Sequence, residues 1–195
     1  MKVLNKKHHG TAWGILVKAS RKYVFKVVLC GEPGVGKSSL IIRYVHNRFQ
    51  TDMSVTLGIN VYTKQIKYGA SGQDLVTLSL FDIGGQERFK DFRHNFVKGT
   101  KAAALVYDVT RPKTLEKLNE WWNQLRTSEP NKPIVTVLVG NKIDLVDFVA
   151  IPEKEGRAFA KNIGSLDHIR TSAKTAQNVN EMFSRLAESI ISQNK

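Results

Sequence analysis

Short apolar runs and helix-like patterns alternate along the 195 residues of the chain. Six stretches predict strands, at 23–30, 58–67, 75–81, 102–108, 134–139 and, more weakly, 166–171. Four stretches with apolar residues at helical spacing lie at 37–47, 112–127, 152–162 and 178–192. Alternating strands and helices are typical of an α/β fold in which helices flank a mostly parallel sheet.

The predicted strands differ in how their apolar residues are spaced. Residues 27–29, 102–106 and 134–139 form continuous apolar runs, which predict central strands buried on both faces. Residues 58–67 and 75–81 instead alternate apolar with polar positions, and Gly-Ala-Ser-Gly at 69–72 suits a turn between them. We therefore expect a six-stranded sheet in which this hairpin adds one antiparallel edge strand.

A phosphate-binding loop is the strongest local signal. Residues 31–38 read Gly-Glu-Pro-Gly-Val-Gly-Lys-Ser, which matches the pattern G-x-x-x-x-G-K-[ST]. The loop follows a predicted strand and precedes a predicted helix, and this context argues against a chance match. Its backbone N–H groups and the helix dipole would attract an anion. Lys37 can reach terminal phosphates, and the Ser38 hydroxyl can bind Mg²⁺.

A second motif follows the strand predicted at 75–81, where residues 82–87 read Asp-Ile-Gly-Gly-Gln-Glu. An acid at the end of a strand beside a phosphate loop can organise the water shell of a metal ion, which suits Asp82. Gly85 can bring its N–H close to a terminal phosphate, because it has no side chain. Gln86 carries both a donor and an acceptor, which suits orienting an attacking water. Alone, this hexapeptide could be an ordinary turn.

Two later segments predict which base is bound. Residues 141–144 read Asn-Lys-Ile-Asp, directly after the apolar run 134–139. The Asp144 carboxylate can accept from the N1–H and the exocyclic amine of guanine, whereas adenine lacks this pair of donors. Residues 172–174 read Ser-Ala-Lys, and the Ala173 N–H can meet the guanine O6. The tripeptide is common in loops, so its position after Asp144 is what supports this assignment.

Together with Thr56 in the polar stretch 49–58, these motifs resemble the Ras superfamily of small GTPases over about residues 23–192. The resemblance implies the P-loop NTPase fold of small G proteins. It implies that Ser38 and Thr56 bind Mg²⁺, that Asp82 holds it through water, and that Phe49 packs against guanine. Gln86 would position the hydrolytic water, and Lys37 would bind the phosphates. The other residues implied at the nucleotide are Gly34, Val35, Gly36, Ser39, Gly85, Asn141, Lys142, Asp144, Ser172, Ala173 and Lys174.

The resemblance also implies how the protein meets its partners. Residues 49–58 and 83–97 would be two switch loops, which the γ-phosphate orders and hydrolysis releases. Effector, exchange-factor and activating proteins would bind there, and we expect a monomer. Residues 106–110 look most like Rab proteins, whereas Ile83-Gly84-Gly85 is closer to Arf and Sar. Val61, Phe81 and Phe96 stand where Rab proteins usually carry an aromatic triad, which argues against typical Rab effectors.

Pro33 stands in the phosphate loop where Ras has glycine. In Ras, a side chain at this position obstructs the arginine that an activating protein supplies, but Rab proteins tolerate other residues there. No arginine of the chain suggests itself as a catalytic group in cis. We therefore expect slow intrinsic hydrolysis that an activating protein accelerates.

About half of the net charge of +13 lies near the start of the chain. Residues 1–22 carry six Lys or Arg and no acid, and they precede the G domain expected at 23–195. We interpret them as a flexible basic extension. An interfacial helix with Trp13, Leu16 and Val17 on one face would instead make a weak membrane contact, and a targeting peptide is a third interpretation.

The chain has a single cysteine, Cys30, which fits a reducing compartment. It ends without a cysteine for prenylation, and Lys2 excludes N-myristoylation. We therefore expect a cytoplasmic protein, peripheral at a membrane at most.

The sequence thus predicts a GTP/GDP switch that hydrolyses GTP with Mg²⁺ in membrane trafficking or signalling. One alternative is a pseudo-GTPase that holds the nucleotide as a structural ligand. A nucleic-acid-linked GTPase is suggested by the charge alone, and we expect no nucleic-acid partner.

Overall fold

The computed structural model describes residues 21–51, 54–69, 74–85, 95–130 and 132–194. Six strands form one sheet in the order β2-β3-β1-β4-β5-β6. The hairpin strands β2 and β3 pair antiparallel, and the other neighbouring pairs are parallel. This confirms the mostly parallel sheet with one antiparallel edge strand. The strands are β1 Lys22–Cys30, β2 Ile59–Tyr68, β3 Asp74–Ile83, β4 Ala102–Asp108, β5 Val135–Asn141 and β6 Asp167–Thr171.

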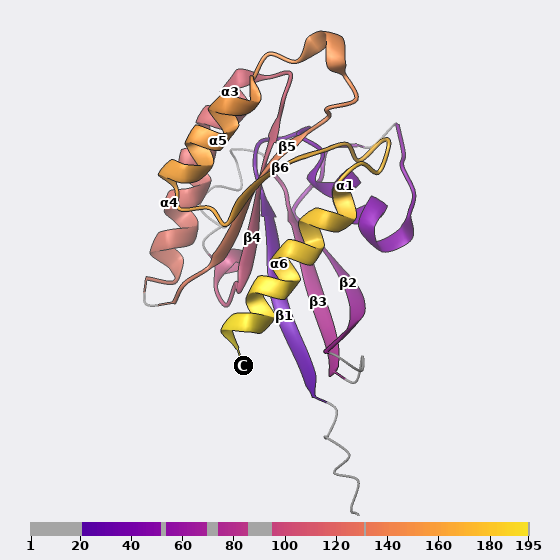
Figure 1. The fold of residues 1–195 in the computed structure, drawn as a ribbon, viewed down its shortest axis with the longest axis vertical. Coiled ribbons are helices and arrows are strands. Elements are labelled where there is room, and N and C mark those ends of the chain that lie inside the picture. Colours follow the sequence, from indigo (N-terminus) through magenta and orange to yellow (C-terminus); the bar gives the residue numbers. More distant parts are fainter. Residues whose placement is uncertain (1–20, 52–53, 70–73, 86–94, 131, 195) are drawn as a thin grey trace, which may run out of the picture.

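Helices cover both faces of the sheet (Figure 1). On one face, α1 (Lys37–His46) and α6 (Val179–Gln193) contribute to one apolar cluster. On the other face, α3 (Pro112–Glu116), α4 (Leu118–Ser128) and α5 (Glu153–Asn162) contribute to a second cluster. A short 3₁₀ helix, η2 (Val146–Phe148), follows β5. The helices predicted at 37–47, 152–162 and 178–192 are confirmed to within one residue at each end.

The prediction of an uninterrupted helix at 112–127 was wrong at one residue. Lys117 keeps right-handed helical angles (φ −65°, ψ −17°), and its N–H bonds to the Lys113 carbonyl at 3.1 Å. However, the Glu120 N–H bonds at 3.2 Å to the carbonyl of Lys117, only three residues back. A local tightening of the backbone bonds therefore separates α3 from α4.

The continuous apolar runs lie at the centre of the sheet, as predicted. Every residue of β4 and β5 is buried, because helices cover both of their faces. In β1, Val27 and Leu29 belong to the cluster under α1 and α6, whereas Val28 and Cys30 belong to the cluster under α4 and α5. The strand that delivers the phosphate loop is thus fixed from both sides.

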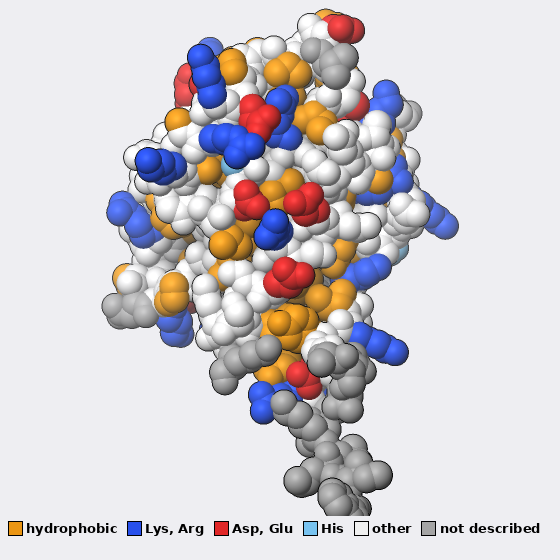
Figure 2. Space-filling model, viewed as in Figure 1, with side chains coloured by type: hydrophobic (Ala, Val, Ile, Leu, Met, Phe, Trp, Pro, Cys, Tyr) orange, Lys and Arg blue, Asp and Glu red, His pale blue; other side chains and the backbone are white. Residues whose placement is uncertain are grey.

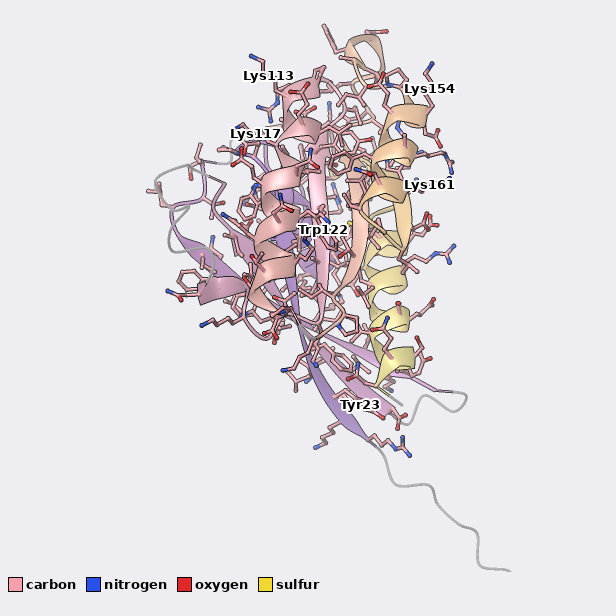
Figure 3. All side chains as sticks on the ribbon, turned by 90° about the vertical axis from the view of Figure 1, so that its left-hand side faces the viewer. Tyr23, Lys113, Lys117, Trp122, Lys154 and Lys161 are labelled. Carbon is pink, nitrogen blue, oxygen red and sulfur yellow. The ribbon has the colours of Figure 1, made fainter. Side chains whose placement is uncertain are left out.

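The two adjacent tryptophans of α4 point to different environments. Trp121 is 1% exposed and belongs to the core beneath α4 and α5. Trp122 is half-buried at the surface of the same helix (Figure 3). This difference follows from the turn of about 100° between successive residues of a helix.

Charged side chains of both signs are interspersed over the face shown in Figure 2, on which α6 lies. The basic excess of the chain is therefore not gathered into a single-sign patch on this face. Most of the basic extension predicted at 1–22 lies outside the described residues, and β1 begins at Lys22. Within the described ranges, no helix combines the length and the apolar character needed to cross a bilayer.

Phe183 anchors α6 to the core, and we expect its removal to destabilise the domain strongly. Its side chain is fully buried and stacks on Tyr44 of α1 with ring centroids 4.0 Å apart. Phe183→Ala should lower the free energy of unfolding by about 3–5 kcal/mol, because it leaves a cavity. Urea denaturation followed by circular dichroism measures this, with the exposed Glu188→Ala on the same helix as a control. A loss below about 1 kcal/mol would contradict the assigned packing.

Candidate functional site

The predicted motifs meet at the edge of the sheet where the parallel strands end. There they surround a pocket of about 390 Å³, within the usual size range of small-molecule sites. The predicted residues that line it are Gly34, Gly36, Lys37, Ser38, Ser39, Phe49, Thr56, Gly85, Asn141, Lys142, Asp144, Ala173 and Lys174. Val35, Asp82 and Ser172 are fully buried behind this lining. Gln86 and most of the loop 83–97 lie outside the described residues.

The phosphate loop presents a cation and the N-terminal end of α1 to the pocket. Lys37 is only 5% exposed, and its Nζ donates to the carbonyls of Gly31 at 2.8 Å and Glu32 at 3.0 Å. The amine is therefore held across the loop beside the pocket. Gly36 caps α1 in a left-handed conformation (φ 98°) without a side-chain hydrogen bond. Gly36 has no side chain to cap the first N–H groups of α1, and a helix N-terminus of this kind attracts an anion.

Three oxygen-bearing side chains from distant segments converge next to the loop. The Ser38 Oγ lies 2.9 Å from the Thr56 Oγ1 and donates to the Asp82 Oδ2. Thr56 also donates to this Asp82 oxygen, at 3.3 Å. The other carboxylate oxygen, Oδ1, is buried and has no hydrogen-bond partner among the described residues. A buried, unpartnered carboxylate oxygen beside two hydroxyls fits a hard cation such as Mg²⁺.

Two glycines allow the loops around this cluster to pack unusually closely. A Cβ on Gly85 would lie 2.6 Å from the Pro33 nitrogen, so residue 85 rests directly on the phosphate loop. A Cβ on Gly84 would lie 2.8 Å from the Thr56 carbonyl oxygen and 3.0 Å from that of Gly58. The Gly84 N–H also donates to the Gly58 carbonyl at 2.9 Å. The segment carrying Thr56 is therefore held against Gly84 without room for a side chain.

At the other end of the pocket, side chains fix the segment 141–144. Asn141 is 1% exposed, and its Nδ2 donates to the Val35 carbonyl of the phosphate loop at 2.9 Å. Its Oδ1 accepts from the Thr171 hydroxyl at 3.1 Å and from the Ala173 N–H at 3.3 Å. The Ser172 Oγ donates to the Asp144 carboxylate at 2.6 Å. This orients an acid that can accept paired donors from a base.

The structure adds a charged cluster that the sequence analysis missed. Asp108, at the end of β4, is 1% exposed and lies 2.7 Å from the Lys142 Nζ and 3.0 Å from the Arg111 Nε. Its carboxylate also accepts from the N–H and the hydroxyl of Thr110. Burial raises the pKa of Asp108, but the hydrogen bonds from Lys142 and Thr110 outweigh it and hold this pKa below its ordinary value. Asp108 is therefore an anion that anchors two cations.

Arg111 lies directly beside the phosphate loop, although no arginine was expected there. Its Nη2 donates to the Pro33 carbonyl at 3.1 Å. The signal available in the sequence was the acid three residues earlier, Asp108, at the end of an apolar run. Asp108 ends β4 and Arg111 directly precedes α3, and the short connection between them brings the two side chains into an ion pair.

Comparison with known proteins gives a consistent family match. A model described as the Ras family matches residues 26–192. The Ras-related protein RABA1b of Arabidopsis thaliana is 37% identical over 178 residues, which cover 91% of this chain and 80% of that protein. The Ras-related protein Rab-31 of Rattus norvegicus is 36% identical over 165 residues, which cover 85% of this chain and 82% of that protein.

Substitution of Gly84 tests the close packing around Thr56. In Gly84→Ala the new Cβ would displace the segment 54–58, which separates Thr56 from Ser38 and Asp82. The measured quantity is the Mg²⁺ concentration that gives half of the maximal rise in melting temperature, determined once with GDP and once with a GTP analogue. We expect this concentration to rise several-fold in the variant when the GTP analogue is bound. The exposed Asn60→Ala in β2 should leave it unchanged. Equal Mg²⁺ dependence in Gly84→Ala and wild type would contradict the close packing.

Proposed function

Because the chain belongs to the Ras family of small GTPases and is Rab-like within it, we propose that it binds guanine nucleotide with Mg²⁺ and hydrolyses GTP. The family match makes the chain a small GTPase of the trafficking and signalling class. Nucleotide binding and GTP hydrolysis by this chain itself are what we propose. The convergence of Ser38, Thr56 and Asp82 beside the phosphate loop is the observation that carries it. These groups come from three separate segments. A cation bound between them would be a ligand that all three share.

Guanine would be recognised at the end of the pocket formed by residues 141–144 and 172–174. Asp144 is already oriented by the Ser172 hydroxyl, and the pocket places Phe49 among the same lining residues. An acid that meets adenine instead of guanine would be left without its pair of donors, which supports selectivity for guanine. The Ala173 N–H, which donates to the Asn141 Oδ1 at 3.3 Å, would turn to the guanine O6.

Hydrolysis would proceed by in-line attack of water on the γ-phosphate. Held by Ser38, Thr56 and Asp82, Mg²⁺ would supply positive charge that stabilises the anionic phosphates. Lys37 and the N–H groups of the phosphate loop would stabilise the charge that develops on the phosphate oxygens. Gly85 would offer its N–H to the γ-phosphate, and Gln86 would orient the attacking water. Catalysis of this kind depends mainly on positioning and electrostatics.

Switching would be controlled by the contact of Thr56 with the γ-phosphate and Mg²⁺. Loss of the γ-phosphate would release Thr56 from Ser38 and Asp82, and with it the segment 49–58. Val55, Leu57 and Val61 are 51%, 68% and 54% exposed along this segment and β2. We assign this apolar surface to effector and regulator proteins, which would distinguish its two states.

Single-turnover phosphate release tests the activity. Wild-type protein loaded with GTP and Mg²⁺ should release phosphate slowly, and Gln86→Leu should release it at least about tenfold more slowly, because a water-orienting group is lost. Both should bind GDP with similar affinity. Tight GTP binding by the wild type without any phosphate release would instead support the pseudo-GTPase alternative.

Asp144→Asn tests the assignment of the base-binding segment. The amide can no longer accept from both guanine donors, so GDP affinity should fall by about tenfold or more, at a cost of about 1.5–3 kcal/mol for a lost charged hydrogen bond. Competition of GTP and ATP against a fluorescent nucleotide measures the preference directly. The nearby exposed Asp147→Asn serves as the control. An unchanged preference for GTP over ATP would refute the role of Asp144.

A further inference from the structure

The peptide group between Pro33 and Gly34 is held from outside the nucleotide pocket. Pro33 has no N–H, so the Gly34 N–H is the first donor that residues 33–36 can offer to a phosphate. The carbonyl of the same peptide group accepts the Nη2–H of Arg111 at 3.1 Å. The guanidinium lies close enough that a Cβ on Gly34 would be 3.6 Å from this nitrogen.

Arg111 is itself fixed in place by a buried anion. Its Nε pairs with the Asp108 carboxylate at 3.0 Å, and that carboxylate is 1% exposed. The same carboxylate oxygen pairs with Lys142 of the base-binding segment at 2.7 Å. Arg111 therefore bridges Asp108 and the phosphate loop with two different nitrogens of one planar group, as a guanidinium can do and an amine cannot.

The direction of the carbonyl sets the direction of the N–H. Pro33 and Gly34 are joined by a trans peptide bond, in which the C=O and N–H point to opposite sides. Arg111 lines a neighbouring hollow with Pro33, Thr110 and Lys113, whereas Gly34 lines the nucleotide pocket. A carbonyl drawn toward Arg111 thus leaves the Gly34 N–H facing the pocket.

Two residues farther along the loop, a second side chain acts in the same way. Asn141 donates to the Val35 carbonyl at 2.9 Å, which orients the Gly36 N–H by the same planarity. Two alternate peptide groups of the loop are therefore held by side chains of two other segments. Both arrangements involve the segment 141–144. Asn141 belongs to it, and Asp108, which anchors Arg111, pairs with Lys142 of the same segment.

We propose that Arg111 is a positioning residue that aims the Gly34 N–H at a nucleotide phosphate, an inference that rests on the proposed nucleotide binding. Arg111 does not serve as a phosphate ligand, since its charge is already paired with Asp108 and its Nη2 with the Pro33 carbonyl. Its effect reaches the phosphate through one peptide plane, so the Gly34 amide reports on it directly.

Two substitutions of Arg111 test this role in the full chain. In Arg111→Ala the Pro33 carbonyl loses its donor, and we expect GDP release to be about tenfold faster, which corresponds to about 1.4 kcal/mol. In Arg111→Lys the amine can keep the ion pair with Asp108 and thus the fold, but it offers one nitrogen where the guanidinium uses two, so we expect the Pro33 carbonyl to lose its donor. Its GDP release should therefore also be faster than that of the wild type. The matched control is Lys113→Ala, since Lys113 lines the same hollow and extends into solvent (Figure 3).

The decisive readout is the Gly34 amide resonance in ¹H–¹⁵N spectra of the GDP–Mg²⁺ complex, together with the ³¹P shifts of the bound nucleotide. Both should move in the two Arg111 variants and stay in place in Lys113→Ala. Release within twofold of the control, or faster release with an unchanged Gly34 amide, would overturn the inference. Failure of the wild-type chain to bind GDP would instead refute the proposed function, so the two failures can be told apart.

Discussion

The register of the central parallel strands is the constraint on which the candidate site depends. Asp108 of β4 lies opposite Asn141 of β5, which in turn lies opposite Thr171 of β6. Leu29, one residue before the end of β1, lies opposite Asp82 of β3. A shift by one residue would turn each of these side chains to the other face of the sheet. The register observed between β4, β5 and β6 brings Asp108, Asn141 and Thr171 together at one edge.

Buried polar groups gather at the edge of the sheet that forms the pocket. Their burial would destabilise the fold if they had no hydrogen-bond or ion-pair partners. Asn141, Asp108, Ser172 and Lys37 are each nearly inaccessible. The first three have partners from another segment, and Lys37 bonds across its own loop. Partnership offsets the desolvation of these groups and leaves few alternative arrangements for the loops. Asp82 differs, because one of its carboxylate oxygens is buried and has no hydrogen-bond partner within the described part of the chain. Contacts within the chain therefore organise most of the pocket, and the buried Asp82 oxygen beside the phosphate loop is the group that a bound cation would complete.

Local patterns predicted the fold better than they predicted contacts between segments. Continuous apolar runs identified β4 and β5, and alternation identified the β2–β3 hairpin, because burial on one or two faces leaves a mark in the sequence. The motifs around Lys37 and Asp144 were equally local. The Arg111–Pro33 hydrogen bond spans 78 positions, and nothing within either segment specifies it. In the sequence, Gly84 indicated only a likeness to one branch of the superfamily. In the structure it packs against the Thr56 carbonyl.

The long sequence separation of the contacts that assemble the pocket links ligand binding to folding. The Asn141–Val35 bond spans 106 positions and the Ser38–Asp82 bond spans 44, so neither can form before most of the sheet has formed. An unfolded or partly folded chain consequently has no pocket to offer. A nucleotide at about 1,000 times its dissociation constant would then add about 4 kcal/mol to the stability of the native chain by mass action. Depletion of nucleotide in a cell would therefore make the protein less stable to unfolding as well as inactive as a switch.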